Sequence, residues 1–296
     1  MTGLNACRRF FAEDIQLTHN IQSAALVEAL AEVPRERFLP PGPWTIRSET
    51  DLLKPLRQTP GDDPRFLYHN VSVAIDPDRM LFNGAPGFVA TAIDALGVAR
   101  GRRVLHVGAG TGYFTALMAH VVGDAGRVVA IEIDADLACQ ASANLTDLPW
   151  VDVRQGDGSS VGDGPFDAIL VNAGVTHAEP AWLKALAAGG HMVLPLTAAM
   201  PAGAHPPGLA MAHISKGLML LVTRTGDPAA CDASVVTFVA IYSAVGLRDD
   251  AINAELGRAM SQSPFPRLQR LRLDTHEPDA SCWCHSSRGC WSLAGR

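Results

Sequence analysis

Three glycines that follow a short apolar run carry the clearest chemical signal in the sequence. Residues 104–107 are typical of a buried strand, and Gly108, Gly110 and Gly112 come directly after them. In open α/β sheets, ligands bind beyond the carboxyl ends of the strands. Glycine lets a nucleotide approach the backbone closely, and the apolar helix expected next offers free N–H groups at its start. The pattern therefore predicts a cofactor of the nucleotide type at this loop.

Two acidic residues stand where the rest of a nucleoside would be held. Glu132 ends the next predicted strand, within the window of about 20 residues after the loop where a carboxylate receives ribose hydroxyls. Asp157 follows the third strand between Gly156 and Gly158, where it could accept the amine of adenine. Each acid alone is more simply interpreted as a solvated loop residue. Their order after successive strands favours a nucleoside pocket.

The spacing of the glycines distinguishes between two cofactors. A dinucleotide fingerprint places its third glycine three residues after the second, but Gly112 follows Gly110 by two residues and Tyr113 occupies the next position. The spacing favours S-adenosylmethionine over a nicotinamide dinucleotide. An NAD-dependent oxidoreductase stays open as an alternative.

The elements around this loop alternate in the order that builds a parallel sheet with crossover helices. Strands are predicted at residues 103–107, 127–131, 151–154, 168–171 and 191–194. Helices are predicted at residues 112–122, 134–145 and 180–188, the last of them closed by Gly189 and Gly190. We therefore expect an α/β fold with a doubly wound, mostly parallel, Rossmann-like sheet.

The segments outside this core differ from it in composition and in hydrophobic pattern. Helical spacing at 18–33 predicts an N-terminal helix that stops at Pro34, and the prolines and glycines of 40–64 forbid a long regular element. This second segment indicates a loop or cap over a site. Apolar runs later in the chain predict a hairpin with a tight turn and a further strand, an antiparallel pair at the sheet edge. The runs are residues 209–214, 218–223 and 235–242, with the turn at Lys216 and Gly217.

The C-terminal part reads as one helix at 249–260 and then, past Pro264, a polar and irregular tail. We expect three parts: an N-terminal helix and proline-rich cap at 1–80, a cofactor-binding domain at 81–246, and a C-terminal helix with a flexible tail at 247–296.

Composition limits the classes of partner. The chain has 296 residues, of which 48% are hydrophobic and 18% charged, enough to bury a sizeable core. Its formal net charge of −6 does not provide the basic surface with which proteins neutralise nucleic acids. We read no export signal at the N-terminus, and the apolar stretch 209–222 is interrupted by His213 and Lys216 and is too short to span a bilayer. We expect a cytoplasmic protein without nucleic-acid or membrane partners.

Three of the six cysteines lie close together near the C-terminus, at Cys282, Cys284 and Cys290. With His285 they have the ligand types that suit zinc, but the spacing is not that of a recognised finger or ribbon. We therefore interpret them as free thiols on a tail and expect no metal.

Several motifs together resemble one family. Residues 104–113 read Val-Leu-His-Val-Gly-Ala-Gly-Thr-Gly-Tyr, and residues 33–40 read Val-Pro-Arg-Glu-Arg-Phe-Leu-Pro. With the segments 126–132, 156–158, 166–174 and 186–195, they make most of residues 19–245 similar to protein-L-isoaspartate O-methyltransferases. The resemblance implies S-adenosylmethionine as cofactor, a peptide or protein carboxylate as substrate, a methyl ester as product and a role in protein repair.

The resemblance also implies roles for residues of the three strand ends. Gly108, Gly110 and Gly112, with Thr111 in the same loop, would hold the methionyl part of the cofactor. Glu132 would hold the ribose. Asp157 and Gly158 would hold the adenine.

Two positions depart from the family pattern. His106 stands where an aspartate is usual, so it is either part of the cofactor site or a buried structural residue. The segment 83–87 aligns with the substrate loop of the family, with Gly84 in place of a serine. Asn83 and Gly84 are accordingly our candidates for substrate contact, and we expect altered or weakened activity on ordinary isoaspartyl peptides.

The expected chemistry needs no base, because a carboxylate acceptor is already ionised at pH 7. A hydroxyl or amine acceptor would need one, and His177 is placed to supply it, although an exposed loop histidine is the simpler interpretation. A different peptide or small-molecule acceptor and a non-catalytic cofactor-binding module are further alternatives.

Overall fold

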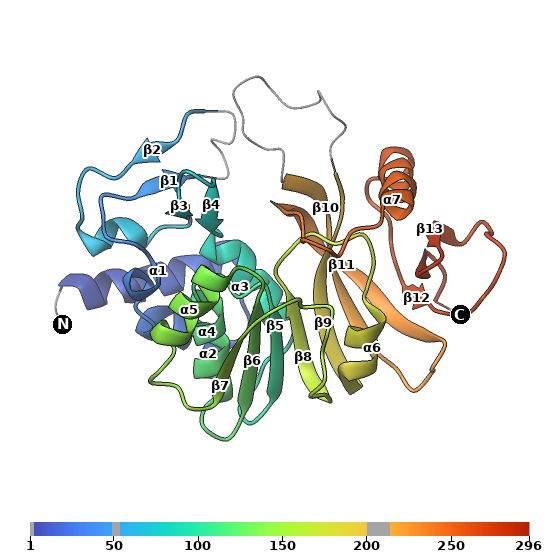
Figure 1. Cartoon of the computed structure of the whole chain (residues 1–296), viewed down its shortest axis with the longest axis horizontal. Helices are drawn as coiled ribbons and strands as arrows, with labels where there is room; N and C mark the ends of the chain where they lie inside the picture. The colour runs from blue at the N-terminus through green and yellow to red at the C-terminus, as the bar shows by residue number, and fades with distance from the viewer. Residues whose placement is uncertain (1–2, 49–53, 200–213, 296) are drawn as a thin grey trace. The chain divides into compact units, whose positions relative to one another are not determined.

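The computed structural model describes residues 3–48, 54–199 and 214–295 (Figure 1). The chain divides into two compact units. The first consists of Met1–Arg103 and Ala109–Gly156, and the second of Val104–Gly108 and Asp157–Arg296. This division does not follow the boundaries at residues 80 and 246 that we predicted. No helix in the described ranges is long and apolar enough to cross a membrane.

The first unit combines helices with a parallel pair of strands. Its α-helices are α1 (Gly3–His19), α2 (Ala24–Glu32), α3 (Pro86–Ala95), α4 (Tyr113–Val122) and α5 (Ala135–Asn144). The parallel strands are β6 (Arg127–Glu132) and β7 (Val151–Gln155). Every residue of β6 after Arg127 is buried. Strands that are buried along their length read as continuous apolar runs, which is why the sequence revealed this one.

The N-terminal helix predicted at 18–33 is wrong in its first part. Helix α1 ends at His19, and Asn20 adopts a left-handed φ of 54° that interrupts the helical backbone. The oxygen of Ser23 then accepts the Leu26 N–H and caps α2. Helix α1 was not predicted from the sequence, because its buried face is narrow and consists of Phe11, Ala12 and Ile15.

The proline-rich region forms short strands in place of a long element. They are β1 (Thr45–Arg47), β2 (Arg57–Gln58), β3 (Ser72–Asp76) and β4 (Leu81–Asn83), antiparallel in the order β2-β1-β3-β4. Two 3₁₀ helices accompany them, η1 (Arg35–Phe38) and η3 (Pro64–Leu67). Trp44, Leu67 and Val73 form a small core of their own. The region is therefore a packed subdomain and not a bare loop.

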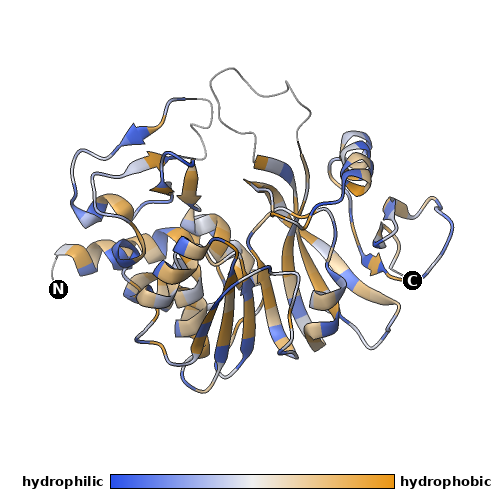
Figure 2. Cartoon of the chain, viewed as in Figure 1, coloured by the Kyte–Doolittle hydropathy of each residue, from blue (hydrophilic) through white to orange (hydrophobic). Residues whose placement is uncertain are grey.

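The second unit contains a run of eight strands. In spatial order they are β5 (Arg103–Val107), β8 (Phe166–Val171), β9 (Leu186–Ala199), β10 (Ile214–Arg224), β11 (Ala230–Tyr242), β12 (Arg270–Arg272), β14 (Gly289–Ser292) and β13 (Cys282–Ser286). The first three are parallel and the remaining pairs are antiparallel. Two helices, α6 (Pro180–Ala185) and α7 (Asp250–Gln262), complete the unit. Hydrophobic colours dominate β8 and β9 in Figure 2, as expected for buried strands.

The expected α/β fold with parallel core strands is confirmed, and so are the five core strands and the helices near 112–122, 134–145 and 249–260, with shifts at their ends. The helix predicted at 180–188 is too long. It ends at Ala185, because Leu186 already belongs to β9. Gly189 does adopt a left-handed φ of 72°, but it does so within that strand.

The flexible tail is wrong for most of its length. Residues of β12, β13 and β14 continue the antiparallel strands of the second unit beyond β11, a much larger addition than the edge pair we expected. Trp283 is buried and its indole N–H donates to the Ser263 carbonyl at 2.9 Å. These strands are only three to five residues long, and β13 and β14 are rich in cysteine and serine, so they lack the apolar alternation by which longer strands are predicted.

The tight turn predicted at Lys216 and Gly217 is also wrong, since both residues lie inside β10. The predicted run at 209–214 falls outside the described residues except for Ile214. A Cβ at Gly217 would lie 2.0 Å from the Leu196 carbonyl oxygen of the neighbouring β9. The glycine is therefore needed for close approach of two strands and not for a reversal of the chain.

We expect Gly217→Ala to destabilise the protein by about 1–3 kcal/mol, the usual cost of forcing atoms into a packed site. The matched control is Gly226→Ala, in the connection between β10 and β11, where an added Cβ meets no described atom within 4 Å. Thermal unfolding of the two variants checks this. Equal melting temperatures would contradict the close approach at Gly217.

Candidate active site

The glycine loop lies between β5 and α4, and all three of its predicted glycines need to be glycine. Their φ angles are 82° at Gly108, 56° at Gly110 and 96° at Gly112. This left-handed region is costly for residues that carry a Cβ. The sequence Gly-x-Gly-x-Gly is thus explained by the backbone conformation of the turn that begins α4.

Gly110 presents an open side. A Cβ built there meets no described heavy atom within 4 Å, whereas one at Gly112 would lie 2.8 Å from the side chain of Leu145. The space beside Gly112 is thus occupied by another part of the protein. Gly110 leaves space beside its backbone, as a loop that receives a ligand must.

Glu132 fixes the loop from the end of β6. One carboxylate oxygen accepts the Gly110 N–H at 2.7 Å, and the other accepts the Asp134 N–H at 3.1 Å. The residue is only 7% exposed. Hydrogen bonds from backbone N–H groups to a carboxylate are stronger than those between neutral groups. The structure therefore brings together two of the predicted cofactor residues, Gly110 and Glu132, by direct contact.

Thr111 provides an unused polar atom in the same loop. Its hydroxyl is buried and has no hydrogen-bond partner among the described residues. Its carbonyl accepts the side-chain N–H of Asn144 at 3.0 Å, which holds the backbone in place. A buried hydroxyl without a partner costs free energy in the ligand-free protein. This arrangement fits a bound molecule that brings a polar group to the loop.

Asp157 and Gly158 follow β7, as predicted. Asp157 is exposed, and its carboxylate accepts the Ser159 N–H at 2.9 Å. Gly158 is buried, and its carbonyl accepts the indole N–H of Trp182 at 2.7 Å. A Cβ at Gly158 would lie 2.4 Å from Val107, so only glycine fits against β5. The contacts of Gly158 with Trp182 and Val107 hold the backbone of this turn, and the Asp157 carboxylate lies at the surface of the second unit.

His106 has no exposed surface, and burial lowers its pKa to about 3. The ring is therefore neutral at physiological pH. Because a cofactor entering from solvent would find no accessible atom on it, this geometry favours the structural interpretation of His106.

Arg35 anchors the predicted substrate loop, a role that was not predicted from the sequence. The guanidinium is completely buried, and burial lowers its pKa to about 10, so it stays charged at neutral pH. It donates to four backbone carbonyls and one carboxamide oxygen, all at 2.8–3.5 Å. These acceptors belong to Leu67, His69, Val71, Gly84 and Asn83. A buried charge needs this degree of hydrogen bonding to be tolerated.

The same guanidinium lies 5.9 Å from the ring centroid of Tyr113, the residue that follows the glycine loop. A cation over an aromatic face is attracted by the ring quadrupole. Arg35 thereby links the substrate loop to the first turn of α4 within the first unit. Arg35 is one of three charged residues in the signature Val33–Pro40, so the sequence alone does not distinguish it from Glu36 and Arg37.

The two candidate substrate residues have different surroundings. Asn83 is buried at the end of β4, with its carboxamide oxygen 3.5 Å from Arg35. Gly84 has room for a side chain, because its nearest neighbour to a built Cβ is Val89 at 3.5 Å, an ordinary contact. Packing therefore does not require glycine at this position.

His177 is not the exposed loop histidine that we preferred. It is 6% exposed, its Nε2 lies 2.7 Å from the Glu179 carboxylate, and its Nδ1 lies 3.0 Å from the Thr176 hydroxyl. Both ring nitrogens are engaged within the second unit. This leaves no free nitrogen with which His177 could serve as a base in the present arrangement.

Comparison with known proteins gives a consistent result. The sequence model described as Protein-L-isoaspartate(D-aspartate) O-methyltransferase (PCMT) matches residues 61–202. Protein-L-isoaspartate O-methyltransferase 1 of Rhodopseudomonas palustris (strain HaA2) is 33% identical over 192 residues, which are 64% of this chain and 69% of that protein.

Solved structures share the fold. A protein-L-isoaspartate O-methyltransferase superimposes with a TM-score of 0.61 and 22% identity, covering 86% of this chain and 68% of the other. A putative protein-L-isoaspartate O-methyltransferase from Plasmodium falciparum, in complex with S-adenosyl-L-homocysteine, gives a TM-score of 0.56 and 16% identity and covers 80% of this chain and 97% of its own. At these identities the structures are evidence of the fold. The sequence match adds the family: this chain belongs to the protein-L-isoaspartate O-methyltransferase family.

Proposed function

We propose that this chain transfers the methyl group of S-adenosylmethionine to a carboxylate of an isoaspartyl residue in a peptide or protein, forming a methyl ester. The observation that carries the proposal is the hydrogen bond from Gly110 to Glu132, beside a loop with an open face, in a chain of this family. Protein repair and a cytoplasmic location are parts of the proposal that follow from this activity.

The residues for the cofactor lie at the ends of β5, β6 and β7. The backbone of Gly108–Gly112, with the unused Thr111 hydroxyl, would hold the methionyl end, and Glu132 would hold the ribose hydroxyls. Asp157 would accept the adenine amine beside the backbone of Gly158. When bound, the cofactor supplies an electrophilic methyl group on a sulfonium.

The acceptor needs binding and orientation more than activation. A carboxylate is ionised at neutral pH, so the chain does not have to remove a proton from it. Holding the reacting atoms at near-attack distance and excluding water can then supply most of the rate enhancement. The two histidines agree with this scheme. His106 is completely buried and neutral, and both ring nitrogens of His177 have hydrogen-bond partners.

Arg35 acts in this scheme as a positioning residue. It does not face the substrate, but it fixes the carbonyl of Gly84 and the carboxamide of Asn83. Because the Asn83 oxygen is turned toward Arg35, the amide N–H groups are the atoms that remain for a substrate carboxylate or its backbone. A loop preorganised in this way loses less conformational entropy when the peptide binds.

The direct test is methylation of an isoaspartyl peptide beside its normal aspartyl twin, with a labelled methyl group. We expect label on the isoaspartyl peptide, released as methanol in mild alkali because the product is an ester. Methyl ethers and methylamines survive this treatment. Label that persists after base would reject carboxyl methylation, and binding of the cofactor without transfer to either peptide would identify a non-catalytic module.

Gly84 should weaken the use of ordinary isoaspartyl peptides, because it lacks the hydroxyl that a serine would offer the acceptor. We expect Gly84→Ser to raise kcat/KM about tenfold to a hundredfold, equivalent to one hydrogen bond to a charged group, ~1.5–3 kcal/mol. Asn83→Ala should lower it. Full family-like activity in the unmodified chain, unchanged by Asn83→Ala, would show that this loop does not select the substrate.

Thr111→Val tests the cofactor site without disturbing the packing. The hydroxyl has no described partner, so the variant should melt at the same temperature as the unmodified chain or higher. Its affinity for S-adenosylhomocysteine should fall about twofold to tenfold, since one hydrogen bond is worth ~0.5–1.5 kcal/mol. Calorimetric titration measures this. Unchanged affinity would remove Thr111 from the site.

A further inference from the structure

We propose that His276, Cys282, His285 and Cys290 bind one Zn²⁺ as a structural site in the C-terminal part of the second unit. One ligand atom from each residue lies within 4.8 Å of all the others. Neither the methyltransferase residues nor the proposed function involves this cluster, so the two proposals stand independently.

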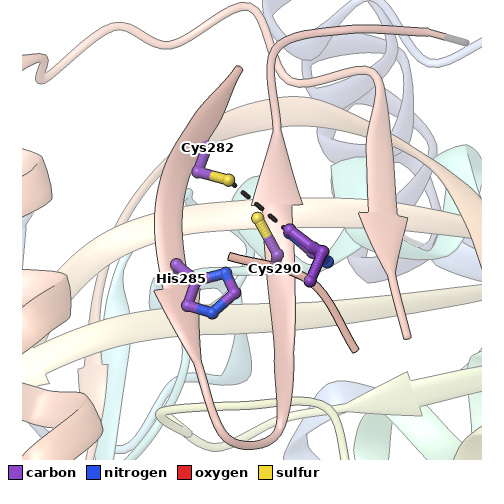
Figure 3. Close-up of side chains that lie close together, drawn as sticks. Cys282, His285 and Cys290 are labelled. Atoms are coloured by element: carbon purple, nitrogen blue, oxygen red, sulfur yellow. Dashed lines mark hydrogen bonds between the residues drawn. The ribbon is translucent and has the colours of Figure 1, made fainter. Parts of the chain in front are cut away.

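The backbone of the β13–β14 hairpin places three of the four side chains on one face. His285 pairs directly with Cys290, and Cys282 pairs with Ser292. Directly opposed residues of antiparallel strands share a face, and so do residues two apart on one strand. Cys282, His285 and Cys290 therefore project from the same side of the hairpin, and Figure 3 shows the two thiols directed toward each other.

A bulge makes this possible. Cys282 and His285 are three residues apart, and in a regular strand they would face opposite sides. The register shifts between Cys282 and Cys284, so that β13 holds one extra residue, Trp283, against β14. Such a bulge turns the later side chains to the other face. The spacing Cys-x-x-His would place the two side chains on opposite faces of a regular strand, but the bulge brings them to one face of β13.

His276 completes the set from the connection that precedes β13. Its Nε2 lies 3.6 Å from the Sγ of Cys282. Two ligands of one tetrahedral zinc ion stand about 3.6 Å apart, given Zn–S near 2.3 Å and Zn–N near 2.0–2.1 Å. The widest separation, 4.8 Å, exceeds this spacing by roughly 1 Å, a difference that small side-chain rotations can close.

The hydrogen bonding of the two imidazole rings, those of His276 and His285, is consistent with metal binding. Nδ1 of His276 lies 3.1 Å from the Asp274 carbonyl and 3.3 Å from its carboxylate, which leaves Nε2 as the free acceptor toward Cys282. Metal-bound histidines usually have such a partner on the second nitrogen. His285 has a buried Nδ1 with no hydrogen-bond partner among the described residues. A bound cation would satisfy that nitrogen.

The donor set identifies the metal. Two thiolates and two imidazoles suit Zn²⁺ in a closed, four-coordinate site, and two thiolates neutralise its charge. His276, His285 and Cys290 also line a cleft of about 660 Å³, which provides a path of entry. Residues 273–281, between β12 and β13, have no helix or strand, so the ion would tie this connection to the hairpin. Metal-binding energy would thereby contribute to the stability of the fold.

The chain itself contains the controls. Cys284 lies in the same strand but is buried among groups near α7, where burial raises its pKa to about 12. Cys139 is exposed on α5. Neither belongs to the cluster, so Cys284→Ala and Cys139→Ser should keep the metal while Cys282→Ser and Cys290→Ser should lose it.

The experiment is elemental analysis of the full chain, purified under reducing conditions from zinc-supplemented cells. We expect one zinc per chain in the unmodified protein and in both controls, and substoichiometric zinc in Cys282→Ser and Cys290→Ser. Chelation should lower the melting temperature by several degrees, and Co²⁺ added to the stripped chain should give the visible bands of tetrahedral thiolate coordination. If the cysteine variants fail to fold, His276→Gln replaces them, because His276 lies outside the strands. This variant should also lose the metal.

Three results would overturn the site. One is an unmodified chain that neither contains zinc nor takes up Zn²⁺ or Co²⁺. Another is a Cys282→Ser/Cys290→Ser double variant that keeps a full equivalent. The third is a disulfide between Cys282 and Cys290 that withstands the reducing purification and excludes the metal.

Discussion

The hydrogen bonds of the buried Glu132 carboxylate are the interactions on which the proposed cofactor site depends. Glu132 stands at the end of β6, and its two carboxylate oxygens accept N–H groups from Gly110 in the loop and from Asp134 at the start of α5. The carboxylate thus fixes the glycine loop relative to the strand that follows it. Without this bond the left-handed glycines would leave the turn with more backbone freedom, which would have to be lost on each binding event.

Arg35 does for the substrate loop what Glu132 does for the cofactor loop. A buried guanidinium that donates to carbonyls from separate segments holds β4 and the connection before β3 around one centre. It also lies over Tyr113, the first residue of α4. The two loops that would meet the cofactor and the acceptor are therefore both set by buried charges, one negative and one positive. Buried charges are tolerated when most of their polar atoms are hydrogen-bonded, so each restricts the backbone around it.

Much of this architecture could be predicted from the sequence. The core strands are continuous apolar runs, and the glycines of the loop are required by their φ angles, so pattern and conformation agree there. The position of Glu132 at the end of the next strand was also predicted, although its hydrogen bond to Gly110 was not.

Features that depend on contacts between distant segments could not be predicted. The role of Gly217 comes from β9 passing 2.0 Å from its Cβ position, and not from any local signal. The burial of His177 arises only in the folded second unit, and the surroundings of Arg35 depend on carbonyls more than thirty residues away. The C-terminal cysteines looked like a tail because their strands are short, and only the bulge at Trp283 brings Cys282 and His285 to one face.

The most direct test of the account is a calorimetric titration of the unmodified chain and of Glu132→Ala with S-adenosylhomocysteine and with NAD⁺. The account predicts that S-adenosylhomocysteine binds the unmodified chain, that NAD⁺ does not, and that Glu132→Ala binds at least about tenfold more weakly, the equivalent of ~1.4 kcal/mol. Binding of NAD⁺ without any response to S-adenosylhomocysteine would contradict the assignment of the cofactor. Unchanged affinity in Glu132→Ala would contradict the central place given to this carboxylate.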